Sequence, residues 1–116
     1  MAFDALGPAA KDAVPALVRG LTNEEWNVRM NSAKALAAVR ATPELAVPAL
    51  VKTLADTNDQ VRVEIATALQ RYRGAAKPAV PALIHMLSDP DENIKSGAGR
   101  ALWAIDPEAA RQAGIP

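Results

Sequence analysis

The sequence repeats itself every 33 residues. The stretch AVPALV at 13–18 returns at 46–51 and, as AVPALI, at 79–84. The same shift superposes aliphatic residues further along the unit: Leu21 with Leu54 and Leu87, Val28 with Val61 and Ile94, and Leu36 with Leu69 and Leu102. No insertion or deletion interrupts this register. The chain is therefore predicted to stack similar units in a row, because each unit is too small to bury its apolar faces alone.

Each unit is predicted to contain two helices. The apolar residues of the first helix in the first unit are spaced i, i+3, i+4 and i+7: Val14, Leu17, Val18 and Leu21. Pro15, Pro48 and Pro81 suit a first turn, where the missing N–H costs little. We therefore expect the main part of each first helix to begin within a few residues before its proline. Any helix further upstream is expected to be kinked or separate.

Polar residues mark the expected helix starts. Asn23, Asp56 and Asp89 share one column in the break before the second helix, and we expect each to cap the helix that follows. In the third unit, the sequence DPDE resembles a capping box that starts at Asp89. Thr42 and Asp106 each precede a proline, which predicts a capped turn ahead of the following helix.

The second helix carries the predicted core stripe: Val28, Ser32, Ala35, Leu36 and Val39 in the first unit, and Val61, Ile65, Ala68, Leu69 and Tyr72 in the second. Half of the residues are hydrophobic but only 3% are aromatic, so the helices must approach closely around small side chains. The predicted fold is an all-α solenoid of antiparallel helix pairs. If Leu17, Leu50 and Leu83 are fully buried, truncation of each to Ala should cost about 2–5 kcal/mol.

Residues 1–116 are predicted to form a single domain of 13–45, 46–78 and 79–112, the last unit including a terminal helix. Residues 1–12 form a partial unit, because Phe3–Asp12 aligns with Leu36–Leu45. This opening half-unit is compatible with an excerpt from a longer array. Gly97 and Gly99 depart from the repeat pattern, and each costs about 1 kcal/mol in a helix, which predicts a looser last unit or a closer helix approach.

Composition excludes several classes of protein. Thirteen basic residues balance thirteen acidic ones, which disfavours partners that reward a one-signed field, such as nucleic acids and membrane surfaces. The absence of cysteine excludes disulfides, a thiol nucleophile and cysteine-ligated metal centres. The first residues do not form a secretory signal, and no segment has the length of a membrane span. A soluble, cytoplasmic protein is the expectation.

The repeated residues resemble a known family. The AVPAL segment, a turn that contains Asp, VR early in the second helix and an AxxAL or AxAL segment before Val or Ile are similar to the HEAT repeat. The resemblance extends from Leu6 to Ile105 and is strongest to the short bacterial kind described as phycobilisome-lyase-type HEAT-like repeats. The final WAIDPEAARQAGIP also resembles the end of bacterial arrays. Ankyrin and tetratricopeptide repeats fit less well, because neither a TPLH-like start nor large aromatics at fixed positions occur.

A basic residue recurs in every unit. Arg29, Arg62 and Lys95 share one column and could form a row of phosphate ligands. In the HEAT family this column more often pairs with acids of the turns, such as Asp56 and Asp89. We favour this structural interpretation, because the spacing follows the repeat itself.

A second stripe of the second helix differs between units: Asn27, Met30, Lys34 and Ala37; Gln60, Val63, Thr67 and Gln70; Asn93, Ser96, Arg100 and Trp103. Equivalent helices of a solenoid line one face, which is expected to be concave. Variation on a constant scaffold is typical of a specific binding face, although a solvated surface varies too. The candidate partner-binding residues are Met30, Lys34, Val63, Thr67, Gln70, Arg71, Ser96, Arg100 and Trp103.

Three aromatic or ionisable residues require separate interpretation. Trp103 is either a binding anchor or a cover for the end of the stack, and the sequence does not separate the two. Trp26 lies in the turn column of Asp59 and Glu92, where a structural role, packing over the incomplete first unit, is expected. His85 has no second histidine or cysteine near it, so a surface position is expected rather than a metal or general-base role.

The resemblance implies a non-catalytic scaffold that binds a protein through the face of its second helices. The partner is not identified, and a second copy of the chain could bind at the ends of the stack. One alternative is a bilin lyase-like or accessory protein, which the subfamily implies. A further alternative is nucleic-acid binding through Lys34, Arg71 and Arg100. No GxxxxGKS, GxSxG or HExxH motif occurs, so no catalytic residue, metal or cofactor is predicted.

Overall fold

The computed structural model describes residues 11–116, and all regular structure in this range is helical. The elements are α3 (Val14–Gly20), α4 (Trp26–Val39), α5 (Pro43–Lys52), α6 (Asp59–Tyr72), the 3-10 helix η1 (Arg73–Ala79), α7 (Val80–Met86), α8 (Glu92–Ile105) and α9 (Pro107–Gln112). The predicted partial unit lies, up to residue 10, outside the described residues. Within them, every helix is too short or too polar to cross a membrane.

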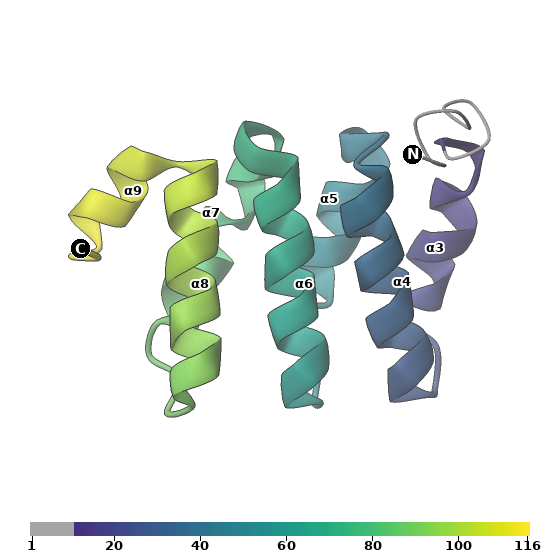
Figure 1. Cartoon of the computed structure of the whole chain (residues 1–116), viewed down its shortest axis with the longest axis horizontal. Helices are drawn as coiled ribbons and strands as arrows, with labels where there is room; N and C mark the ends of the chain where they lie inside the picture. The colour runs from purple at the N-terminus through teal and green to yellow at the C-terminus, as the bar shows by residue number, and fades with distance from the viewer. Residues whose placement is uncertain (1–10) are drawn as a thin grey trace.

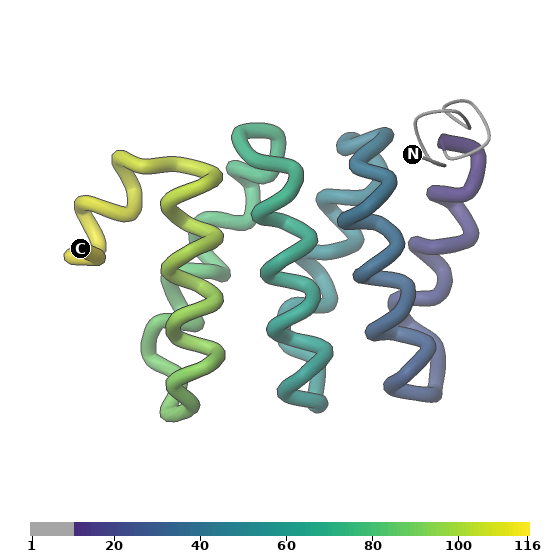
Figure 2. Tube along the Cα trace, in the orientation of Figure 1, coloured from purple at the N-terminus to yellow at the C-terminus, as the bar shows by residue number. Residues whose placement is uncertain are grey.

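The helices form two layers (Figure 1). α4, α6 and α8 lie side by side in one layer, where α6 packs against both neighbours. α3, α5 and α7 form the layer behind them, and each packs against the second helix that follows it in the chain. The pairs follow one another in a single direction along the trace in Figure 2. This translational order confirms the predicted α-solenoid.

The core lies between the two layers and consists of aliphatic side chains. Leu50 and Leu83 are fully buried, so they meet the condition set above, and their truncation is expected to cost about 2–5 kcal/mol. Leu17 is only partly buried, so the condition for that cost is not met at this residue. It lies on α3, the first helix of the described range, where α4 and α5 are the helices that pack against it.

A close contact inside the first unit explains the polar core residue Ser32. This side chain is 6% exposed and faces Gly20 of α3. A Cβ atom at Gly20 would lie 2.0 Å from the Ser32 Oγ, so α3 and α4 approach each other more closely than an alanine would permit without a shift of the Ser32 side chain. Gly97 and Gly99 of α8 lie in an uninterrupted helix and would have room for a Cβ. The close approach therefore occurs at Gly20 and does not require either glycine of α8.

The predicted helix caps are displaced by two residues. The N-cap residues of α4, α6 and α8 are Glu25, Asn58 and Asp91, and the last two accept backbone hydrogen bonds with their side chains. The predicted caps instead accept from the backbone N–H two residues ahead: Asn23 from Glu25 at 2.9 Å, Asp56 from Asn58 at 2.9 Å and Asp89 from Asp91 at 2.8 Å. These Asx turns position the true caps.

The first helices differ in how they begin. In the second unit, α5 starts at Pro43 and continues through Pro48, so the upstream turn is not a separate helix there, and a kink at Pro48 stays a prediction. In the third unit, the separate η1 precedes α7, as expected. Asp106 caps α9 by accepting from the N–H of Ala109 at 3.2 Å. Thr42 precedes α5 with φ of 50° and makes no side-chain cap, which contradicts the cap expected of it.

Candidate functional site

The exposed face of α4, α6 and α8 carries the candidate residues, and the repeat sets their positions. Residues 33 apart occupy equivalent places on neighbouring helices, so side chains form rows that cross the three helices. One row holds Asn27, Gln60 and Asn93; the next holds Met30, Val63 and Ser96; a third holds Lys34, Thr67 and Arg100. We call this surface the second-helix face.

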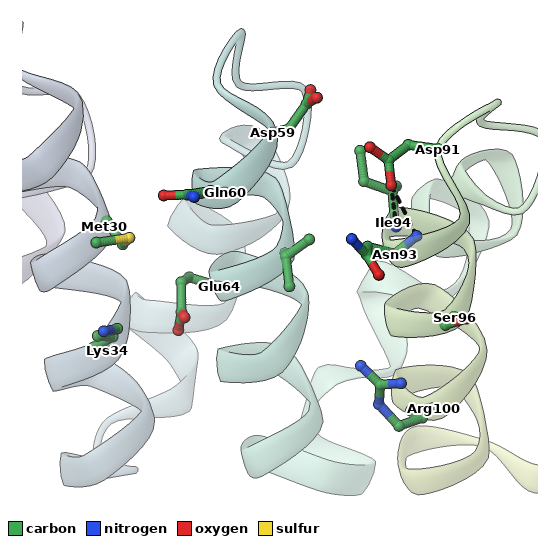
Figure 3. Close-up of a pocket in the computed structure, with 11 residues that line it drawn as sticks. Met30, Lys34, Asp59, Gln60, Glu64, Asp91, Asn93, Ile94, Ser96 and Arg100 are labelled. Carbon is green, nitrogen blue, oxygen red and sulfur yellow. Dashed lines mark hydrogen bonds between the residues drawn. The ribbon is translucent and has the colours of Figure 1, made fainter.

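A groove of about 470 Å³ crosses the second-helix face from α4 to α8 (Figure 3). Five predicted residues line it: Met30, Lys34, Val63, Ser96 and Arg100. The side chains of Asp59, Gln60, Glu64, Asp91, Asn93 and Ile94 complete the lining and were not among the predicted site residues. The groove is therefore mixed in character, with apolar side chains between charged and amide groups.

The other predicted residues lie outside this groove. Thr67 is partly buried and its hydroxyl donates to the Val63 carbonyl at 3.0 Å, within its own helix. Gln70 and Trp103 line a second hollow near the C-terminus of the chain. Arg71 lines a third hollow at the C-terminal end of α6, together with Arg40 and Arg73. The structure thus brings five of the nine candidates together.

Trp103 lies near the C-terminal end of α8, beside the last residues of the chain. Its side chain packs against the core and lines the second hollow with Ile115 and Pro116. The indole N–H is buried and finds no acceptor within residues 11–116. Packing at the end of the described stack is therefore one role of this residue, whereas its use as a binding anchor stays a prediction.

The basic column joins neighbouring units, as the structural interpretation predicted. Arg29 donates to both carboxylate oxygens of Asp56, from Nε at 2.7 Å and from Nη2 at 3.1 Å. Arg62 donates to the Asp56 carbonyl at 2.6 Å and lies 3.8 Å from Asp89. These guanidinium groups are occupied by the scaffold, which leaves them poorly suited to bind an external phosphate.

Three charged groups of the groove are not occupied in this way. Asp59 pairs with Arg62, and Asp91 caps α8. In contrast, Lys34, Glu64 and Arg100 form no ion pair or side-chain hydrogen bond within residues 11–116. Figure 3 shows Glu64 reaching from α6 towards α4, and Arg100 reaching from α8 towards α6. Positive, negative and positive groups therefore follow one another across the face.

Sequence reasoning missed Glu64, and the reason is geometric. Its column contains Asn31 and Gly97, which lie beside the variable stripe of the second helix rather than on it. Gln60 and Asn93 belonged to that stripe but were not selected as site residues. Their recurrence with Asn27, one amide in each unit, was the signal in the sequence that pointed to them.

The remaining ionisable and aromatic residues, His85, Tyr72 and Trp26, lie outside the groove. His85 is exposed on α7. The described residues contain no group of three or more His, Cys, Asp or Glu side chains placed to hold a metal ion. Burial raises the pKa of Tyr72 to about 12, and its hydroxyl donates to the Ala41 carbonyl at 2.8 Å. Trp26 is 44% exposed and lines a hollow with residues 57–60 of the second unit, so it faces that turn.

Comparisons with known proteins agree with this architecture. The family model for HEAT repeats matches residues 1–70 and 47–113. The chain is also similar to a solved structure, the crystal structure of an engineered protein from the Northeast Structural Genomics Consortium, with 27% sequence identity and a TM-score of 0.64. That alignment covers 97% of this chain and 63% of the engineered protein. No curated protein matches the sequence significantly. Two overlapping matches to one repeat model, on a solenoid of helix pairs, show that the chain belongs to the HEAT repeat family.

Proposed function

We propose that this protein is a non-catalytic scaffold that binds a protein partner through the groove of the second-helix face. HEAT repeats generally serve as scaffolds for protein interaction. The observation that carries the proposal is the contrast between two sets of charges. Arg29, Asp56 and Arg62 are used inside the solenoid, whereas Lys34, Glu64 and Arg100 point into a groove that spans three helices.

The composition of the groove favours a peptide over the two alternative ligands. Three carboxylates, Asp59, Glu64 and Asp91, line it beside two cations, Lys34 and Arg100, so the groove lacks the one-signed positive field that favours a nucleic-acid backbone. The bilin alternative rests on the subfamily resemblance alone, and no specific feature of the groove favours it. A protein segment can use the apolar, amide and charged groups together, which fits the mixed lining.

Selection from a random peptide library displayed on phage tests the proposal directly. We expect enriched peptides to bind the wild-type protein and to lose binding to the Ser96→Arg variant, because Ser96 is exposed and a long side chain there fills the groove. His85→Arg is the matched control, since it introduces the same side chain at an exposed site on α7. Equal binding to both variants would exclude the groove as the binding site.

The nucleic-acid alternative and self-association are each tested by a separate measurement. Affinity for generic duplex DNA that falls steeply with added salt would favour the nucleic-acid alternative. Sedimentation at increasing protein concentration tests self-association at the ends of the stack. Cytoplasmic location and bacterial origin remain predictions from the sequence.

A further inference from the structure

The rows of the second-helix face also constrain the charge pattern and the backbone conformation of a peptide ligand. Lys34, Glu64 and Arg100 lie on α4, α6 and α8, one on each successive helix. Packed helices have axes about 8–10 Å apart. A ligand that crosses the helices therefore meets a positive, a negative and a positive residue in turn, one on each of three helices spaced by about that length.

The amide row restricts the conformation of the ligand. Asn27, Gln60 and Asn93 are exposed, and their carboxamide groups make no hydrogen bond within the described range. A carboxamide both donates and accepts, so it can bind the N–H and C=O groups of a backbone whose own hydrogen bonds are unmade. A helical ligand has already used these groups, whereas an extended or polyproline II segment presents them.

The spacing between neighbouring helices then distinguishes a polyproline II segment from an extended β-strand. Polyproline II has three residues per turn and rises about 3.1 Å per residue, so residues i, i+3 and i+6 lie on one side at intervals of about 9.3 Å. This interval equals the expected distance between neighbouring helices. In a β-strand, residues three apart point to opposite sides, and same-side residues recur at about 6.6 Å. Polyproline II is therefore the conformation that matches one residue to each helix.

The ligand has a place between the two polar rows. Met30 and Val63 lie about one helical turn from the amide row on one side and from the Lys34 row on the other. A backbone above these apolar side chains reaches the amides on one side. Its own side chains extend to Lys34 and Arg100 on the other side, and to Glu64, which directly follows Val63 in the chain.

Resting on the proposed scaffold function, we propose that the second-helix face binds a polyproline II segment with acidic, basic and acidic side chains at i, i+3 and i+6. The acidic residues pair with Lys34 and Arg100, and the basic residue pairs with Glu64. Because the charge pattern is the same in both directions, charge alone does not fix the polarity of the bound segment.

The test compares two synthetic peptides by NMR titration of the ¹⁵N-labelled protein. PPEPPKPPEPP carries the proposed charges, and PPKPPEPPKPP carries the opposite charges on the same backbone. We expect the first peptide to shift resonances of α4, α6 and α8 and to bind about tenfold more tightly, since each exposed ion pair contributes a fewfold to affinity. This preference should weaken as salt is added.

A charge-inverted protein makes the test specific to the three residues. In the triple variant Lys34→Glu, Glu64→Lys and Arg100→Glu, the preference should switch to PPKPPEPPKPP. The matched control inverts exposed charges of the first-helix layer by the same total: Arg19→Glu, Glu44→Lys and Lys52→Glu. It should keep the wild-type preference.

The outcomes distinguish this inference from the proposed function. Equal binding of the two peptides, a preference that survives the triple inversion, or tighter binding of duplex DNA would overturn the charge pattern. If neither peptide binds while library peptides bind and are lost in Ser96→Arg, the ligand class is wrong and the groove remains the binding site. If no library peptide depends on Ser96→Arg, the proposed function fails as well.

Discussion

The two junctions between neighbouring units use the same columns of the repeat but are held differently. At the first, Arg29 makes a two-bonded pair with Asp56, and Tyr72 donates to the Ala41 carbonyl near the other end of the helices. At the second, Arg62 lies 3.8 Å from Asp89, and the aliphatic Ile105 occupies the column of Tyr72. The first junction is thus held by polar contacts near both ends.

One residue of the turn explains the difference in the ion pairs. Three positions before each basic residue, the sequence has Trp26, Asp59 and Glu92. Asp59 accepts from Arg62 at 2.5 Å, and Glu92 lies 3.0 Å from Lys95, whereas Trp26 offers Arg29 no carboxylate. A basic residue therefore reaches fully into the next unit only where its own helix supplies no competing acid.

The largest expected effect is the loss of Asp56. Its side chain is 8% exposed and accepts three hydrogen bonds, two from Arg29 and one from the N–H of Asn58. Asp56→Ala leaves the partly buried guanidinium of Arg29 without its carboxylate partner. The variant should therefore have a free energy of unfolding that is lower by about 2–4 kcal/mol. Urea unfolding followed by circular dichroism measures the change.

The matched variant for the second junction is Asp89→Ala. The longer distance between Arg62 and Asp89 predicts a cost of about 1 kcal/mol, mainly from the lost bond to the N–H of Asp91. Equal losses in the two variants would show that the junctions do not differ in strength.

Tyr72 is expected to make the first junction sensitive to alkaline pH. Its pKa is raised to about 12 in the folded protein, above the value near 10 of an unfolded tyrosine. The neutral form is therefore favoured by folding. Its contribution is complete below about pH 10 and is lost as pH rises towards 12, by about 1–3 kcal/mol.

Tyr72→Phe isolates this contribution from the titration of lysines. At neutral pH the variant should be less stable by about 1 kcal/mol, because the Ala41 carbonyl loses its donor. Between about pH 9 and 11.5 the wild type should lose more stability than the variant, so the gap narrows. Parallel stability curves over this range would contradict the assignment.

Two glycines should respond to alanine with opposite signs. At Gly97, a Cβ would meet only the Arg100 Nη2 at 3.9 Å, so Gly97→Ala should stabilise α8 by about 1 kcal/mol through helix propensity. At Gly20, the Cβ would lie 2.0 Å from the Ser32 Oγ, so Gly20→Ala should destabilise the first unit. Hydrogen exchange of α8 shows whether Gly97→Ala stabilises this helix, which belongs to the second junction. A loss of stability in Gly97→Ala would contradict the room seen beside this residue.

The repeat register predicted most of the fold, because the helix pairs recur with the period of 33 residues. The pairing of Arg29 with Asp56 was expected from the resemblance to HEAT repeats. The cap of α6 was misplaced because Asp56 and Asn58, two residues apart, are both capping residues, and only the backbone shows which one begins the helix. At the candidate site, the register predicted which rows face outwards. It did not identify Glu64, since the use of a charge depends on which neighbours already pair with it.

The smallest expected effect tests the cause of the difference between the junctions. Asp59 is mostly exposed, so Asp59→Ala should change the stability by about 0.5 kcal/mol or less. Its consequence lies in the coupling between Arg62 and Asp89, which a double-mutant cycle measures. With Asp59 present, the coupling should be close to zero, because Arg62 is held by its own helix. Without Asp59, the guanidinium is free to approach Asp89, and the coupling should rise towards about 1 kcal/mol. A coupling that stays unchanged would mean that the backbone separation of α6 and the Asp89 turn, rather than competition for Arg62, sets the distance at the second junction.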